Sequence, residues 1–415
     1  MKFKKFLIYI DDEKKTFKKM KIKNLVNHKK SKNILKIKKH SKRKKEIKYK
    51  NNEREKISKT IFLLILLGIY ILFQKYITKI FFYNLHNNKK RVGVTNLPND
   101  QNVGNILVKF ALFTKLKEYG FNVTMIIPWN KNNTDLSFIN RTINSNLYTI
   151  KKDFSELNES DFDYLIVNSD QTWGGISCRS DIGFLEFAKD WKTKKFIYAA
   201  SIGTDRWGFS KMFDGKIKSL IKNFTGISFR EIGTVKLAEE HLDVKGLFVL
   251  DPTLIIDKQY YLNEIKYYKS DYNLKDKFIF VYQLDKNEIV EKYINDTSEK
   301  LNCKINQLNF NRSDYIESFI FGISHSQGVI TDSYHGTIFS IIFDKPFITF
   351  INKERGKGRF DSLIEVFHLE NRIIDISMNK SLDINLLKER PNINKTLFKQ
   401  LRTFSINYLK RNLNL

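Results

Sequence analysis

The sequence predicts an α/β protein in which two doubly wound domains face a cleft, preceded by a basic tail and an apolar helix. The chain has 415 residues, which is more than one hydrophobic core usually serves. Strand and helix patterns alternate in two successive blocks, as expected for parallel sheets covered by helices. Apolar residues make up 42% of the chain, with only 5 Pro and 18 Gly, which excludes a mainly disordered or fibrous protein.

The first 60 residues form a basic tail. They hold 24 Lys and Arg against 6 Asp and Glu, whereas the remaining 355 residues hold 49 against 39. We expect residues 1–60 to be flexible and to be attracted to anionic lipid head groups, at about 1 kcal/mol per basic residue near the surface. The alternative is a general enrichment in lysine. Specific nucleic-acid binding is not expected, because no aromatic or glycine pattern accompanies the charge.

An apolar segment follows the tail. The uninterrupted run Ile61–Phe73 covers roughly 20 Å as a helix, less than the ~30 Å of a bilayer core. Extension to Tyr83 adds length and includes Lys75 and Lys79, which lie on one helical face and can snorkel to the head groups. We expect residues 61–83 to form a membrane-anchor helix, single-pass or monotopic, with a buried core helix as the alternative.

The first domain is expected over residues 90–265 and is Rossmann-like. A strand at Arg91–Thr95 precedes a helix at Asn105–Tyr119, whose apolar residues have helical spacing, and Gly120 marks the end of that helix. A strand at Phe121–Ile127 completes a βαβ unit. Helices are predicted at 209–224 and 231–242. Further strands are predicted at Tyr164–Val167, Phe196–Ala200, Gly226–Phe229 and Leu247–Leu250.

A second Rossmann-like domain is expected over residues 275–390, after a linker at Asp257–Lys277. Its helices are predicted near 286–301, 313–324 and 334–343. Residues 391–415 are expected to form a C-terminal helix that packs back across the first domain. The strands of this domain are predicted at Phe278–Leu284, Lys304–Phe310, Gly328–Thr331 and Phe347–Ile351.

Polar residues that directly follow strands are the best candidates for a site, because ligands of open α/β sheets bind beyond the carboxyl ends of the strands. After the strand at Gly328–Thr331, His335 stands at the start of a helix and can carry a proton or contact an anion. Its neighbours Asp332, Ser333, Gly336 and Thr337 complete this turn. The alternative is that Asp332 and Ser333 only cap the helix while His335 packs locally.

Cations follow two other strands. The loop after Phe347–Ile351 alternates glycine with Arg355, Lys357 and Arg359, a composition suited to a phosphate or carboxylate, although such a loop can also be a solvated turn. Arg230 follows the strand at Gly226–Phe229 and offers a fixed cation; pairing with Glu231 at the surface is the alternative.

Other polar groups near predicted strand ends are typical of carbohydrate contacts. Ser169, Asp170, Gln171 and Trp173 follow the strand at Tyr164–Val167, although Asp170 could equally cap a helix. Asp251 with Pro252 is expected to be a structural turn. The sequence has no Walker phosphate loop, HExxH, GxSxG or CxxC motif, and its two cysteines, Cys178 and Cys303, cannot build a disulfide framework or a cysteine-rich zinc site.

Several short motifs occur in an order that resembles the polysaccharide pyruvyl transferase family over roughly residues 90–375. They are Asn-Val-Gly-Asn (102–105), Asn-Ser-Asp-Gln-Thr-Trp (168–173), Ala-Ala-Ser-Ile-Gly (199–203), Ser-Phe-Arg-Glu (228–231), Leu-Asp-Pro-Thr-Leu (250–254), Thr-Asp-Ser-Tyr-His-Gly-Thr-Ile-Phe (331–339) and Arg-Gly-Lys-Gly-Arg-Phe (355–360). Asn168 departs from the family, which usually has Gly before Ser-Asp-Gln. The resemblance implies a two-domain fold of the GT-B type.

The resemblance also implies an activity and a set of site residues. The family transfers a pyruvyl group from phosphoenolpyruvate to sugar hydroxyls and forms a ketal, so the expected acceptor is a glycan or lipid-linked saccharide, with phosphoenolpyruvate as co-substrate and no further cofactor or metal. His335 is the expected catalytic residue. The expected donor-binding residues are Arg230, Arg355, Gly336, Thr337 and Arg359. The expected acceptor or cleft residues are Asn102, Asn105, Ser169, Asp170, Gln171, Trp173, Asp332 and Ser333.

Two other functions remain open from the sequence: a GT-B-type glycosyltransferase that uses a nucleotide-sugar donor, and a catalytically silent glycan-binding protein of the same fold.

The sequence also leaves open on which side of the membrane the catalytic domain lies. The positive-inside rule keeps the basic tail cytoplasmic and would place a domain beyond a single span on the far side. Because the donor is cytosolic, we expect the catalytic domain on the cytoplasmic face, with the lumen of the secretory pathway as the alternative.

Overall fold

The structure is a computed structural model that describes residues 89–98, 101–128, 137–143, 146–174, 179–270, 276–351, 356–378 and 383–415. The chain divides into two compact units, Met1–Leu85 and His86–Leu415. The predicted tail (1–60) and anchor (61–83) lie outside the described residues. Within the described residues, no helix has the length and apolarity needed to cross a membrane.

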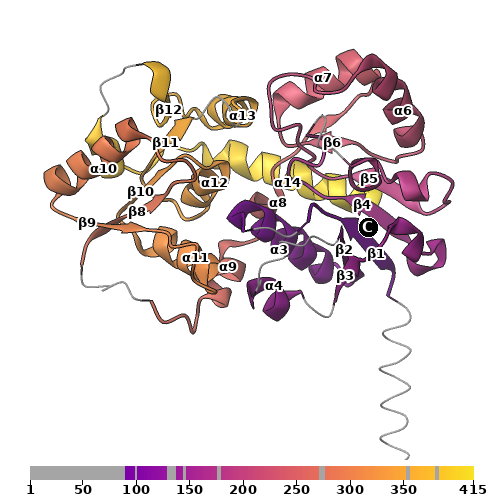
Figure 1. Ribbon diagram of the computed structural model, residues 1–415, viewed down its shortest axis with the longest axis horizontal. Coiled ribbons are helices and arrows are strands. Elements are labelled where there is room, and N and C mark those ends of the chain that lie inside the picture. The colour runs from indigo at the N-terminus through magenta and orange to yellow at the C-terminus, as the bar shows by residue number, and fades with distance from the viewer. Residues whose placement is uncertain are drawn as a thin grey trace, which may run out of the picture. The chain divides into compact units, whose positions relative to one another are not determined.

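The first domain is built on a parallel five-stranded sheet with the strand order β3-β2-β1-β4-β5 (Figure 1). Consecutive strands extend to one side from β1 and the chain then returns to the other side, so the order reverses between β1 and β4. Reversals of this kind place a crevice at the carboxyl ends of the two strands. The strands are β1 (Arg91–Thr95), β2 (Asn122–Pro128), β3 (Leu147–Ile150), β4 (Tyr164–Val167) and β5 (Lys194–Ile197).

Two short strands continue the direction of this sheet beyond β5. β6 (Ser228–Phe229) pairs in parallel with β7 (Leu247–Phe248), and bridges join Asp170 to Ala200 and Ala200 to Phe229. The ends of β4, β5 and β6 therefore lie side by side. The helices of this domain are α3 (Val103–Glu118), α4 (Ser137–Thr142), α5 (Ser180–Gly183), α6 (Lys211–Ile221), α7 (Ile232–Leu242), α8 (Pro252–Ile255) and α9 (Lys258–Glu264), with 3-10 turns at Phe154–Glu156, Glu159–Asp161 and Glu186–Ala188.

The second domain has its own parallel five-stranded sheet, in the order β12-β11-β10-β8-β9, which reverses between β8 and β10. Its strands are β8 (Phe278–Tyr282), β9 (Lys304–Gln307), β10 (Gly328–Thr331), β11 (Phe347–Ile351) and β12 (Ile373–Asp375). Its helices are α10 (Glu288–Leu301), α11 (Tyr315–His325), α12 (Tyr334–Ile342) and α13 (Gly358–Phe367), with 3-10 turns at Ile376–Met378 and Ile384–Leu387. The predicted fold class, two doubly wound α/β domains, is confirmed.

The segment expected as a linker, Asp257–Lys277, contains the helix α9, which its tyrosine- and lysine-rich sequence does not predict. Asp257 caps this helix by accepting a hydrogen bond from the Gln259 N–H at 2.8 Å. Tyr261 is fully buried, and its hydroxyl donates to the Thr253 carbonyl at 2.9 Å. Tyr260 and Tyr268 are partly buried against the same core, whereas Tyr267 is 85% exposed.

The C-terminal helix α14 (Lys395–Asn412) lies against the first domain. In Figure 1 it runs from the side of the second sheet to β4 and β5. The Tyr408 hydroxyl donates to the Ile197 carbonyl at 2.7 Å, and the Leu250 N–H donates to Ser405 Oγ at 2.9 Å.

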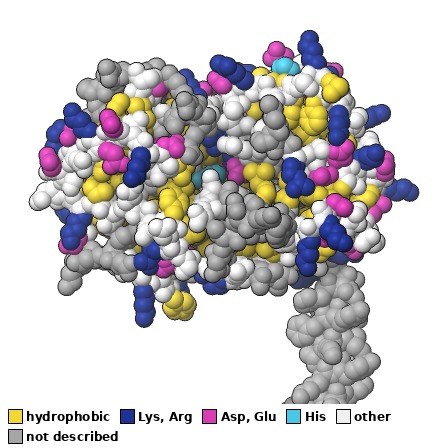
Figure 2. All heavy atoms as spheres, viewed as in Figure 1, with side chains coloured by type: hydrophobic (Ala, Val, Ile, Leu, Met, Phe, Trp, Pro, Cys, Tyr) yellow, Lys and Arg dark blue, Asp and Glu magenta, His cyan; other side chains and the backbone are white. Residues whose placement is uncertain are grey.

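Acidic and basic side chains are interspersed on the face seen in Figure 2 rather than gathered in one basic patch.

We predict that α14 is part of the cooperative core. Leu409 is 0% exposed, so Leu409→Ala should lower the free energy of unfolding by about 2–5 kcal/mol. Phe404, on the same helix, is 46% exposed, and Phe404→Ala should cost less than about 1 kcal/mol. Urea unfolding followed by tryptophan fluorescence measures both. Equal losses from the two substitutions would contradict a core role for the buried face of α14.

Candidate active site

Side chains from the carboxyl ends of both sheets meet in one buried cluster. Arg230, the first residue after β6, is its centre, and its side chain is 0% exposed. Its Nη1 donates to Asp251 Oδ2 at 2.7 Å and to Ser169 Oγ at 3.4 Å. Its Nη2 donates to Asp170 Oδ1 at 3.2 Å, and its Nε to Glu231 Oε1 at 3.3 Å. One guanidinium thus joins three carboxylates from the ends of β4, β6 and β7.

The electrostatics of this cluster follow from burial and from the central cation. Burial alone would raise the pKa of Asp170 and of Asp251. For Asp170 the charges of Arg230 and Arg359 outweigh burial and lower the pKa. For Asp251 a contact with His335 and the charge of Arg230 hold the pKa well below its usual range. Both carboxylates are therefore ionised at neutral pH, and they raise the pKa of Arg230 in turn.

The second domain contributes Tyr334 and His335, the first two residues of α12. The Tyr334 ring lies 4.8 Å from the Arg230 guanidinium and 5.7 Å from that of Arg359, so one aromatic ring contacts both cations. Burial raises the pKa of the Tyr334 phenol, which stays neutral. Burial and repulsion by Arg230 lower the pKa of Arg359. An anion beside Arg359 would relieve that repulsion.

His335 is held between the two domains. Its Nε2 is buried and lies 3.7 Å from Asp251 Oδ2, beyond hydrogen-bonding distance. On the other side of the ring, a Cβ added to Gly104 would lie 1.9 Å from Nδ1. The first turn of α3 therefore approaches the imidazole so closely that only glycine fits at position 104. His335 consequently stands beside a helix N-terminus as well as beside a carboxylate.

The loops of the two domains also touch next to the cluster. Gly203 and Gly356 have φ values of 80° and 96°, which favour glycine. A Cβ on Gly356 would lie 1.6 Å from the Gly203 carbonyl oxygen, and one on Gly203 would meet the side chain of Gln171. In addition, the Ile232 N–H at the start of α7 donates to Ser362 Oγ of α13 at 2.9 Å. These contacts hold the ends of the two sheets together.

The structure brings most of the predicted site residues to this junction. Arg230, Ser169 and Asp170 are in the cluster, with His335 and Arg359 beside it. Asn102 caps α3, since its Oδ1 accepts from the Gly104 N–H at 2.8 Å, and so it fixes the turn that His335 touches. Arg355 lies outside the described residues.

Other predicted residues are engaged in packing or in backbone contacts. Asn105 donates to the Pro98 carbonyl at 2.8 Å and accepts from the buried Lys109 at 2.6 Å. The Trp173 indole is fully buried between Phe184 and Phe229 and donates to the Gly183 carbonyl at 2.9 Å.

Around β10 the predicted residues stabilise the turn that carries His335. The Asp332 carboxylate accepts from the backbone N–H groups of Leu284 and Asp285 and so ties together the ends of β8 and β10; Ser333 makes no side-chain capping bond to α12. A Cβ on Gly336 would lie 2.3 Å from Thr331 Oγ1, and the Thr337 hydroxyl lies 2.8 Å from that of Thr349. These contacts set the position of the first turn of α12.

Sequence reasoning missed the roles of Asp251 and Tyr334, and it considered Glu231 only as a surface partner of Arg230, whereas this pair is buried. Asp251 was expected to be a structural turn, and it does cap α8, since its Oδ1 accepts from the Thr253 N–H at 3.0 Å. Its other oxygen reaches the cluster. The available signal was its position: Asp251 follows β7 just as Arg230 follows β6 in the neighbouring strand.

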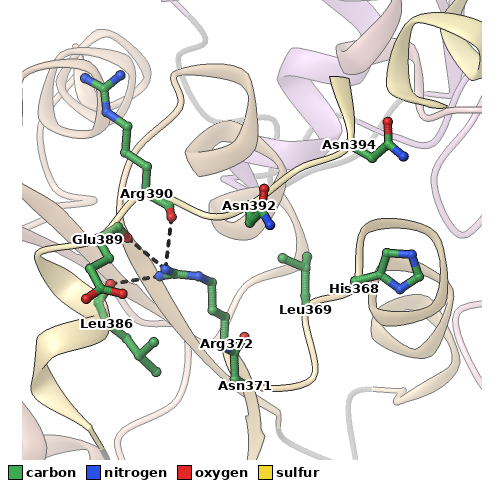
Figure 3. Close-up of a pocket in the computed structure, with 9 residues that line it drawn as sticks. All are labelled: His368, Leu369, Asn371, Arg372, Leu386, Glu389, Arg390, Asn392 and Asn394. Carbon is green, nitrogen blue, oxygen red and sulfur yellow. Dashed lines mark hydrogen bonds between the residues drawn. The ribbon is translucent and has the colours of Figure 1, made fainter. Parts of the chain in front are cut away.

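A cavity of about 630 Å³ lies away from this cluster, between the end of α13 and the start of α14 (Figure 3). Its central cation is already engaged, because Arg372 donates to the backbone carbonyls of Leu386, Glu389 and Arg390 at 2.8–3.2 Å. Arg372 therefore holds the backbone of residues 386–390 in place.

Within the described parts of the chain, no group of three or more His, Cys, Asp or Glu is arranged to hold a metal ion.

The comparison with protein-family models agrees with the motifs. A family model described as polysaccharide pyruvyl transferase matches residues 102–354. A search of curated proteins finds no match. A UDP-GlcNAc 2-epimerase from Methanocaldococcus jannaschii is similar in structure, with 14% identity, a TM-score of 0.45, and coverage of 78% of this chain and 99% of that one. A glycosyltransferase from Rickettsia africae has 13% identity, a TM-score of 0.42, and coverage of 78% and 94%.

We predict that Arg230→Met lowers the free energy of unfolding by about 3–5 kcal/mol at pH 7, because it leaves buried carboxylates without their cation. The pKa values of Asp170 and Asp251 are lowered in the folded state, so their stabilising contribution is present above the unfolded value of about 4 and is lost as pH falls further. The difference in the free energy of unfolding between wild type and Arg230→Met should therefore become smaller below about pH 4.

Urea unfolding at several pH values measures this gap. Arg206 is an exposed arginine of the same domain, and Arg206→Met should change the stability by less than about 0.5 kcal/mol at any of them. A gap for Arg230→Met that stays constant with pH would show that the carboxylates are not the cause.

Proposed function

Because this chain belongs to the polysaccharide pyruvyl transferase family, we propose that it transfers a pyruvyl group from phosphoenolpyruvate to hydroxyls of a glycan or lipid-linked saccharide. The product is a pyruvate ketal. The observation that carries this proposal is the convergence of His335, Arg230 and Arg359 at the facing ends of two sheets. A proton carrier beside two cations suits the protonation of an anionic enol phosphate such as this donor.

The charges of the cluster support an anionic donor. Phosphoenolpyruvate carries a phosphate and a carboxylate, which arginine binds well through paired N–H donors. Arg230 is already engaged by three carboxylates. In this proposal it therefore contributes mainly its positive charge and holds the neighbouring groups in position. Arg359, partly exposed and repelled by Arg230, is the cation that gains most from an arriving anion. Arg355 belongs to the same loop and is proposed to add a second contact.

The proposed reaction needs acid–base chemistry only. His335 delivers a proton to the methylene carbon of phosphoenolpyruvate, and a sugar hydroxyl bonds to the adjacent carbon. The bond from that carbon to the phosphate oxygen breaks, and a second hydroxyl closes the ketal ring. Two hydroxyl protons are lost in all; one ends on the new methyl group and the other on the released phosphate. The scheme calls for no cofactor besides the donor.

The membrane part of the proposal concerns residues outside the described ranges. We propose that residues 61–83 and the basic tail hold the enzyme at a membrane, where a lipid-linked acceptor would be found. Full-length chain should sediment with membranes, and the fragment His86–Leu415 should stay in the supernatant, because it forms a compact unit of its own. A fragment that sediments equally would remove residues 1–85 as the anchor.

We predict that the full chain releases phosphate from phosphoenolpyruvate together with a ketal-bearing glycan, and that His335→Ala lowers this turnover by about 10²–10⁴-fold. Mass spectrometry of candidate acceptors and a phosphate assay measure both products. His368→Ala is the control, because that side chain is 69% exposed and lies at the cavity instead. It should turn over like wild type.

Two results would contradict the proposed reaction. Turnover with a nucleotide-sugar and none with phosphoenolpyruvate would favour a glycosyltransferase. Glycan binding without turnover of either donor, with His335→Ala binding as well as wild type, would favour a silent binding protein.

A further inference from the structure

Asp251 is a fully buried carboxylate that contacts both the arginine and the histidine of the site. Its Oδ1 is fixed by the Thr253 N–H at 3.0 Å and by the Thr253 hydroxyl at 2.6 Å. Its Oδ2 accepts from Arg230 Nη1 at 2.7 Å and lies 3.7 Å from His335 Nε2. With both oxygens held, the carboxylate cannot rotate, and one lone-pair direction of Oδ2 remains for the imidazole.

The imidazole is fixed by its surroundings in the same way. Tyr334 packs edge-on to it, with ring centroids 5.2 Å apart and an interplanar angle of 85°. Gly104 packs against the ring near Nδ1 and Cε1 so closely that a methyl group there would have to displace the ring, whereas Nε2 alone of the two ring nitrogens is buried without a hydrogen-bond partner among the described residues. The ring therefore has one orientation, with Nε2 toward the carboxylate and Nδ1 toward the first turn of α3.

A neutral imidazole beside a carboxylate keeps its single proton on the nitrogen that faces the charge. In His335 that nitrogen is Nε2, which is buried and has no hydrogen-bond partner among the described residues. The lone pair then belongs to Nδ1. A substrate bound at the start of α3 would meet this nitrogen, and not Nε2.

We propose that Asp251 is the positioning residue of the site: it holds His335 as the Nε2–H tautomer, so that Nδ1 is the atom that exchanges a proton with the substrate. The inference rests on the proposed function for the identity of the reaction. The tautomer itself does not depend on which donor the enzyme uses.

The capping role of Asp251 can be separated from this positioning role. Asparagine is as good an N-cap as aspartate, so Asp251→Asn keeps the start of α8. It removes the charge that selects the tautomer. Arg230 retains Asp170 and Glu231, so donor binding should change less than turnover.

The test uses the full chain with ¹⁵N-labelled histidine, and His335→Gln assigns the His335 signals. In wild type, the ¹⁵N shifts of the neutral ring should show a protonated Nε2 and a bare Nδ1. In Asp251→Asn the proton should move to Nδ1 or be shared. With phosphoenolpyruvate as donor, kcat should fall about 10²–10⁴-fold while KM for the donor stays within about threefold.

Glu231→Gln is the matched control, because Glu231 is a buried carboxylate that contacts Arg230 and is not paired with His335. It should keep the wild-type tautomer. A protonated Nδ1 in wild type overturns the proposal even if Asp251→Asn fails to fold. An unchanged tautomer or an unchanged kcat in Asp251→Asn overturns it as well. If wild type forms no ketal, the proposed reaction fails, whereas the tautomer still decides the role of Asp251.

Discussion

The buried ion cluster around Arg230 is the constraint on which the rest of the site depends. One guanidinium at 0% exposure binds three carboxylates that come from the ends of β4, β6 and β7. Removing two or more charges from water is costly unless every lone pair and N–H finds a partner. The cost is offset here because the bridges between Asp170, Ala200 and Phe229 bring these strand ends into one row. The cluster therefore fixes the floor of the site.

The second domain completes the site through a few close contacts. Tyr334 lies on Arg230, His335 lies against Gly104 of α3, and Gly356 meets the Gly203 carbonyl. The helix that carries Tyr334 and His335 begins at the reversal between β8 and β10, just as α3 begins after β1, next to the reversal in the first sheet. The ends of the two sheets thus meet where their strand orders reverse, and the reacting groups proposed here belong to both domains.

The sequence predicts the strands of the two sheet centres well, because β1, β4, β8, β10 and β11 are short apolar runs. The edge strands β3 and β12 are not predicted from the sequence, since Leu147–Ile150 and Ile373–Asp375 are short and lack a distinctive apolar pattern. Residues that follow strands could be proposed as site residues, and Arg230 and His335 were found in this way. Asp251 was not, because its Asp-Pro turn has an adequate local explanation. Only the fold shows that its second oxygen reaches the histidine.

In the proposed reaction, the junction of the two domains binds phosphoenolpyruvate with its anionic groups toward Arg359 and its methylene carbon toward His335. A crystal structure of the full chain with phosphoenolpyruvate bound tests this most directly. We expect donor oxygens within hydrogen-bonding distance of Arg359 and the methylene carbon in contact with the His335 ring. Donor density in the cavity beside Arg372, with the junction unoccupied, would contradict it.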